Sequence, residues 1–249
     1  MTGPGGSPGL SRRSLLLGVS AGTGLAVGAG LAVGAGATEL ANVVAGGSPA
    51  PSGVVPPGET LMEEHGILKR VLLIYQAAIS RLAAGQEPPP ASAIHGGALI
   101  IHDFIEAFHE ALEEGYVFPA LQGVGYLVPT LNTLLLQHGR GREITQLLLA
   151  DATTASLAGE AVRTRVSAAL AAFVRMYQPH EAREDTVVFP AYRALIGPAG
   201  LDRVGATFAA LQRQQFGPNG LAEVLSQVVA IEQSLGVYDL SQFTPPPVA

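Results

Sequence analysis

The sequence HEALEEGYVFPA at residues 109–120 returns with small changes as HEAREDTVVFPA at residues 180–191. The two leading histidines are 71 positions apart, and eight of the twelve residues are identical. A single histidine precedes each copy, in EHG around His65 and in QHG around His138, and these two are 73 positions apart. The chain therefore carries a duplication, and each half supplies one single histidine and one His-x-x-x-Glu pair.

The chain is predicted to be helical from residue 59 onward, because apolar residues recur at helical spacing and no strand pattern interrupts them. The first helix is expected to open with a capping box, Thr60 to Glu63, and to stop near Gly85. Later helices are expected at about residues 92–114, 129–155, 159–195 and 221–235. We therefore predict an all-α fold: an up-down four-helix bundle over residues 59–196, with one or two extra C-terminal helices at 197–249 that pack on it.

Four histidines fall on the apolar faces of four different predicted helices: His65, His109, His138 and His180. A buried polar ring costs several kcal/mol unless it has a partner. The four-residue spacing of each His-x-x-x-Glu pair places Glu113 about one helical turn from His109, on the same face. The same spacing places Glu184 beside His180. These six residues are predicted to form one metal site in the bundle core.

Other polar and aromatic residues near these motifs have simpler interpretations. His95 and His102 are interpreted as hydrogen-bonded core histidines, because a lone inward histidine is more often a core residue than a ligand. Glu114 and Asp185 are interpreted as solvated or salt-bridged carboxylates. The Phe-Pro pairs near the end of both copies, at residues 118–119 and 189–190, are interpreted as helix-end packing rather than as a substrate site.

Composition excludes several classes of protein. The formal net charge is -6, and the only lysine is Lys69, so clustered cations that could bind nucleic-acid phosphates are missing. The chain has no cysteine, which excludes disulfides, thiolate metal sites and cysteine nucleophiles. Histidine and carboxylate must therefore carry any metal chemistry.

The N-terminus resembles a twin-arginine export signal over residues 1–37, followed by a flexible linker at 38–58. Arg12 and Arg13 directly precede an uncharged run rich in glycine and alanine that ends in AGA. We therefore expect an exported, extracytoplasmic protein. The alternative is an uncleaved segment that tethers the protein weakly to the membrane, although many glycines make a poor anchor helix.

The four motifs together resemble the hemerythrin family in its bacterial HHE cation-binding form. The matching segments span residues 60–195: MEEHG, FHEALEEGYVFPAL, LLQHGRGREIT and PHEAREDTVVFPAY. The resemblance implies an oxo- or hydroxo-bridged pair of irons as the cofactor. It also implies terminal ligands at His65, His109, His138 and His180, and bridging ligands at Glu113 and Glu184. From the residues alone zinc and manganese are alternatives, since imidazole and carboxylate suit several metals.

One departure from the family leaves the function open between three classes. Oxygen carriers of this family have a fifth histidine one turn after the ligand of the third helix, and this position is Arg142 here. One class binds oxygen or stores or senses iron, with a dry pocket lined by residues such as Phe104, Phe108 and Phe173. The second is an oxidoreductase acting on peroxide or nitric oxide, which a missing ligand would favour because it leaves a metal position open. The third is a structural or partner-binding bundle with an inert metal.

Replacing Arg12 and Arg13 together by lysine is expected to retain the folded protein in the cytoplasm, because the export route requires the arginine pair. Cell fractionation followed by immunodetection measures this. Unchanged export of the double variant would show that residues 1–37 are not a twin-arginine signal.

Overall fold

The computed structural model describes residues 54–87 and 90–248. The predicted signal at 1–37, and most of the predicted linker, lie outside the described residues. Within the described part the chain is helical and contains no strand. None of the described helices is long and apolar enough to cross a membrane.

Thirteen helical segments make up the described chain, several of them continuous with the next. The first half contains α2 (Pro57–Ala83), α3 (Ala91–Ile100), η1 (Ile101–His109), α4 (Glu110–Leu112), η2 (Glu113–Val117) and α5 (Phe118–Gly123). The second half contains α6 (Val128–Asp151), α7 (Thr154–Leu157), α8 (Glu160–Arg183), η3 (Glu184–Val188) and α9 (Phe189–Phe216). The C-terminal segments are α10 (Gly220–Ser234) and η4 (Leu240–Phe243).

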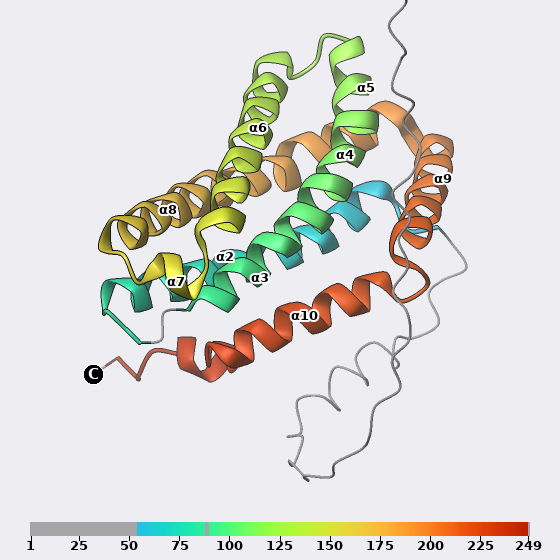
Figure 1. Ribbon diagram of the computed structural model, residues 1–249. Helices are drawn as coiled ribbons and strands as arrows, with labels where there is room; N and C mark the ends of the chain where they lie inside the picture. The colour runs from blue at the N-terminus through green and yellow to red at the C-terminus, as the bar shows by residue number, and fades with distance from the viewer. Residues whose placement is uncertain (1–53, 88–89, 249) are drawn as a thin grey trace, which may run out of the picture. The chain divides into compact units, whose positions relative to one another are not determined.

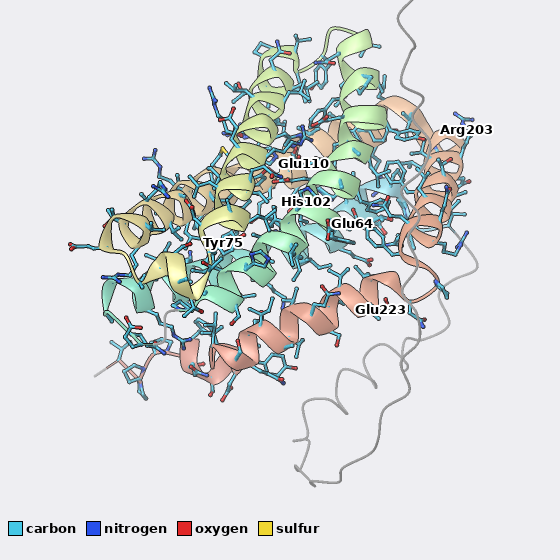
Figure 2. All side chains as sticks on the ribbon, viewed as in Figure 1. Glu64, Tyr75, His102, Glu110, Arg203 and Glu223 are labelled. Atoms are coloured by element: carbon cyan, nitrogen blue, oxygen red, sulfur yellow. The ribbon has the colours of Figure 1, made fainter. Side chains whose placement is uncertain are left out.

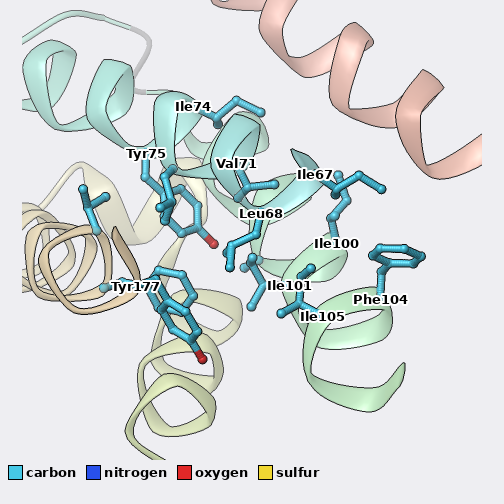
Figure 3. Close-up of a cluster of buried hydrophobic side chains, with 14 of the residues drawn as sticks. Ile67, Leu68, Val71, Ile74, Tyr75, Ile100, Ile101, Phe104, Ile105 and Tyr177 are labelled. Carbon is cyan, nitrogen blue, oxygen red and sulfur yellow. The ribbon is translucent and has the colours of Figure 1, made fainter. Parts of the chain in front are cut away.

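The predicted four-helix bundle is confirmed. Helix α2 packs against α3 and α8, and α6 packs against the same two helices, so the four form a closed ring. Figure 1 shows these helices side by side, with α10 beside α3. Apolar side chains of α2, η1 and α8 fill the space between them, as Figure 3 shows for Leu68, Val71, Tyr75, Ile101, Ile105 and Tyr177.

The start of the first helix differs from the prediction. Helix α2 begins at Pro57, earlier than the proposed capping box, and its N-cap residue Pro56 makes no side-chain capping bond. Proline is favoured at the first helical position because the missing N–H would have no helical acceptor there. The Thr60 hydroxyl instead donates to the Pro56 carbonyl oxygen, 3.5 Å away. The end is as predicted, since Gly85 follows α2 with a positive φ of 65°.

The second bundle helix continues beyond its predicted end near residue 114, and neither the second nor the fourth helix ends at its Phe-Pro pair. Both pass through π-helical segments, η2 and η3. In these segments a backbone carbonyl accepts a hydrogen bond from the N–H five residues later, whereas in an α-helix the donor is four residues later. The N–H of Phe118 donates to the carbonyl of Glu113, and that of Phe189 donates to the carbonyl of Glu184. The following prolines lack an N–H, so the wider turn lets the helix continue instead of ending.

The C-terminal extension is attached to α2 by charged contacts. Helix α9 bends at Gly197, whose φ of 61° and ψ of 179° are not helical, and the predicted helix end near residue 195 corresponds to this bend. Arg70 on α2 donates from Nε to Oε1 of Glu232 on α10, 2.9 Å away. Arg81 donates to the backbone carbonyl of Leu235 at the end of α10.

Helices α6 and α8 approach closely at Gly141. A Cβ at this position would overlap the hydroxyl of Tyr177 and come within 2.9 Å of its ring. The hydroxyl is buried there and donates to Glu110 Oε1 at 2.7 Å. The glycine therefore makes room for an aromatic ring that packs against His180, with ring centroids 5.1 Å apart.

We expect Gly141→Ala to lower the free energy of unfolding by about 1 to 3 kcal/mol, because Tyr177 must move out of a packed core. Gly139→Ala is the matched control on the same helix, since a Cβ there meets nothing within 4 Å. The control is expected to be neutral or stabilising, since alanine favours helix over glycine. Equilibrium unfolding in urea compares the two. Equal stability of both variants would contradict the close approach.

Candidate metal centre

The structure brings the six predicted site residues together in the bundle core. Two clusters form, one of His65, His109 and Glu113 and the other of His138, His180 and Glu184, each with its donor atoms within 4.8 Å of one another. All six side chains are buried. They come from α2, η1, η2, α6, α8 and η3, and so from all four helices of the ring.

Each glutamate lies between the two clusters. Glu113 places Oε1 3.5 Å from His109 Nε2 and Oε2 3.5 Å from His138 Nε2. Metal bonds of about 2.1 Å put neighbouring donor atoms of one ion roughly 3 to 3.5 Å apart, so these separations suit shared ions.

Glu184 repeats this arrangement with a single oxygen. Its Oε2 lies 3.2 Å from His180 Nε2 and 3.4 Å from His65 Nε2. Each carboxylate therefore reaches one histidine of either cluster, as a bridging ligand must.

The glutamate oxygens have no hydrogen-bond partner among the described residues. All four oxygens of Glu113 and Glu184 are buried and unpartnered, despite the nearby imidazoles. Burying an uncompensated carboxylate costs several kcal/mol, so native structures pair such groups or coordinate them to a metal. The donor set thus fits a pair of cations.

Two carboxylates orient the single histidines through their Nδ1 atoms. Asp185 Oδ1 lies 2.7 Å from His65 Nδ1, and Glu114 Oε1 lies 2.9 Å from His138 Nδ1. Asp185 also pairs with Lys69 and Glu114 with Arg142, so the interpretation of both as salt-bridged carboxylates is confirmed. Each follows the glutamate of one half directly and holds the single histidine of the other half, so the two halves brace each other. A carboxylate on Nδ1 leaves Nε2 free for a metal.

The paired histidines are held by the residues that precede the single histidines. Glu64 Oε2 lies 2.9 Å from His109 Nδ1, and Gln137 Oε1 lies 2.9 Å from His180 Nδ1. Figure 2 shows the Glu64 side chain among the bundle helices. Sequence reasoning missed both partners, although the matched positions in EHG and QHG were a usable signal.

A cation four residues after each single histidine completes the pattern. Lys69 Nζ donates to Asp185 Oδ2 at 3.2 Å, and Arg142 Nη2 donates to Glu114 Oε1 at 2.7 Å. Arg142 also donates to Glu110 Oε2 at 2.8 Å. Its guanidinium therefore lies on the Nδ1 side of His138. Arg142 occupies the position at which oxygen carriers of the family have a fifth histidine, and within the duplication it corresponds to Lys69.

The two Phe-Pro segments pack against histidines rather than at helix ends. Phe118 stacks on His138 with centroids 5.6 Å apart and an interplanar angle of 22°. Phe189 stacks on His65 at 5.5 Å and 24°. The interpretation as packing residues is right, but the predicted location at a helix end is wrong. The rings shield the imidazoles from water.

His95 and His102 are not core histidines. Both are partly exposed, and Nδ1 of His102 lies 2.7 Å from its neighbour Asp103. His102 lies in the π-helical segment η1, where the wider turn rotates residues four apart off a common face. The interpretation of His102 as a core histidine is therefore wrong, although it does have a hydrogen-bond partner.

The three phenylalanines proposed to line one dry pocket lie in two clusters. Phe104 and Phe108 pack against Phe216 of α9, with centroids 5.4 and 5.1 Å from it. Phe173 packs instead against Tyr75 and Tyr177. The three rings therefore do not line one common pocket, and this prediction is wrong.

Charges around the site shift the pKa of several groups in the metal-free protein. Burial alone would lower the pKa of His109, but Glu113 and Glu64 outweigh it and raise the pKa well above the usual value. Burial lowers the pKa of His65 and of His138 as well. Hydrogen bonds to carboxylates, Asp185 for His65 and Glu114 for His138, are the main contributions that outweigh burial and raise both pKa values.

Together the fold and the buried clusters define a metal-binding helical bundle. Residues 57–192 match the model of the hemerythrin HHE cation-binding domain. The chain is 46% identical over 187 residues to uncharacterized proteins of Mycobacterium bovis and Mycobacterium tuberculosis, which covers 75% of this chain and 73% of each relative. No solved structure matches it. The chain belongs to the hemerythrin HHE family.

We expect the metal-free protein to melt at lower temperature as the pH rises above about 6.5, the ordinary histidine value. The folded-state pKa values of His65, His109 and His138 are raised, so their stabilisation is complete below the unfolded value and is lost as the pH rises through the folded values. Metal requires neutral imidazoles, so the melting temperature gained on metal binding should increase with pH. Melting curves with and without metal test this, with His102→Ala as a control that keeps the pattern. A metal effect independent of pH would contradict it.

Proposed function

We propose that this bundle holds a pair of metal ions, iron in the native protein, and binds dioxygen there. The observation that carries the proposal is the set of four unpartnered carboxylate oxygens surrounded by four imidazole Nε2 atoms. The histidines would be terminal ligands, and Glu113 and Glu184 would bridge the two ions. When bound and reduced, an iron pair supplies the electrons that dioxygen takes up.

The protein's own residues would support this centre in three ways. Hydrogen bonds at the four Nδ1 atoms set the orientation and tautomer of each ring, as outer partners of metal-bound histidines do. The stacked rings of Phe118 and Phe189 exclude water from two imidazoles. Two bridging carboxylates offset part of the charge of two cations, which lowers the cost of burying them.

A second candidate function is an oxidoreductase that acts on peroxide or nitric oxide. It is favoured by Arg142, because the guanidinium is bound by Glu110 and Glu114 and lies on the outer side of His138. The chain thus offers one imidazole fewer than an oxygen carrier with a fifth histidine, and an ion with fewer protein ligands has room for a reacting molecule.

We also propose that the bundle acquires its metal before export. A route that carries folded proteins suits a site assembled from all four helices, because metal binding and folding are linked. The two adjacent arginines, Arg12 and Arg13, support this proposal because they resemble the motif of a twin-arginine signal.

Protein purified with its native metal is expected to contain about two metal ions per chain, and the reduced iron form is expected to bind dioxygen reversibly. His109→Ala and His180→Ala should each lower metal content and oxygen uptake to a similar degree, because each removes one terminal ligand from one cluster. Elemental analysis and anaerobic oxygen titration measure the two quantities. His95→Ala is the control and should change neither.

The outcomes separate the candidate functions. Full metal content in the double variant His109→Ala with His180→Ala would overturn the site assignment. Rapid turnover of added hydrogen peroxide without reversible oxygen binding would replace the carrier by the oxidoreductase. A redox-silent metal such as zinc in the native protein would leave only a structural bundle.

A further inference from the structure

The four histidines of the proposed centre are not held alike. The Nδ1 atoms of three of them contact carboxylates, at His65, His109 and His138. The Nδ1 of His180 contacts the side-chain oxygen of Gln137, which carries no charge. A carboxylate raises the basicity of a metal-bound imidazole and an amide does so less. His180 is thus the least strongly supported of the four.

His180 also forms part of the wall of a surface cavity of about 240 Å³ between α6 and α8. The cavity is lined by Thr130, Thr133, Leu134, Gln137, Pro179, His180 and Arg183. This lining contains one cation and no carboxylate. The cavity therefore joins the protein surface to a residue of the metal centre, in surroundings that suit an anion.

The corresponding positions of the first half are closed. Pro179 corresponds to Phe108, and Arg183 corresponds to Leu112, each pair being 71 positions apart. Phe108 and Leu112 are 3% and 4% exposed, so both are buried. Pro179 and Arg183 are exposed. The duplication has thus placed bulky buried side chains beside His109 and an open, polar wall beside His180.

The C-terminal extension covers the first half in addition. Phe216 of α9 contacts Phe108 edge-on, with centroids 5.1 Å apart and an interplanar angle of 86°. Helix α10 packs on α2, α3 and α9. These contacts bury the surface next to His109, so access to the centre is most open on the side of His180.

We propose that the cavity between α6 and α8 is the route by which small inorganic anions reach the metal centre, and that they bind on the side of His138 and His180. This inference rests on the proposed metal pair. Arg183 makes no hydrogen bond or ion pair with the residues described, so its charge is available at the mouth. The chain as a whole carries a net charge of -6, which makes a local cation important for attracting an anion.

The chain has no cysteine, so a single introduced cysteine can be labelled selectively to block the cavity. Thr133→Cys places a single thiol in the cavity wall, where a bulky thiol reagent can be attached. Thr60→Cys is the matched control, because Thr60 lies 73 positions earlier at the equivalent point of the first half. Both hydroxyls donate to a backbone carbonyl four residues earlier, so each substitution removes the same kind of contact.

The probe is azide, mixed with the ferric iron-loaded protein and followed by stopped-flow absorbance. Labelled Thr133→Cys is expected to bind azide roughly tenfold more slowly than unlabelled protein, at unchanged metal content, because the label must move aside first. Labelled Thr60→Cys should bind at the wild-type rate. Pro179→Phe, which installs the residue of the first half, should slow binding without a label. Arg183→Leu should lower the rate roughly two- to fivefold at low salt, and the difference should vanish at high salt.

The failures are distinguishable. A chain that holds no metal pair would overturn the proposed function and the route together. Two metals per chain with no azide complex, or with azide rates unaffected by labelled Thr133→Cys and by Pro179→Phe, would overturn the route alone. A slower rate in labelled Thr60→Cys than in labelled Thr133→Cys would place the entrance in the first half.

Discussion

The structure depends on two buried carboxylates that the rest of the protein does not satisfy. Glu113 and Glu184 sit between four imidazoles with all their oxygens unpartnered among the described residues. Desolvation of two such charges opposes folding by several kcal/mol each unless positive charge beside them offsets it. In the metal-free chain the raised pKa values of His65, His109 and His138 favour protonated imidazoles, whose positive charge offsets part of this cost.

The duplicated halves orient each other's buried histidines. The carboxylate after each ligand glutamate holds the single histidine of the opposite half, and a cation four residues beyond that histidine binds the same carboxylate. A change in one half therefore affects ligand orientation in both. The halves differ at Gln137, Pro179 and Arg183, and these differences gather around one histidine. The six predicted ligands are thus related by the duplication, but their surroundings differ between the two clusters.

The π-helical segments explain how the ligand glutamates and the prolines coexist on continuous helices. An interior proline normally ends or kinks an α-helix, since it removes a hydrogen bond and crowds the preceding turn. The wider turns at η2 and η3 begin at Glu113 and Glu184, so the helix continues and the phenylalanines reach the imidazoles. Irregular helical turns of this kind are often found at functional sites.

The sequence alone determined the bundle and the six inward ligand candidates, because helical spacing and a 71-residue repeat are local patterns readable without coordinates. It also showed Arg142 in place of a histidine. Only the tertiary structure decided what holds each imidazole, since Asp185 meets His65 across 120 positions of chain. It also decided that His102 turns outward, because a π-helical turn shifts a face that regular spacing predicts. The open side at His180 depends on how neighbouring helices and the C-terminal extension cover the two halves, and packing between distant segments leaves no periodic signal in the sequence.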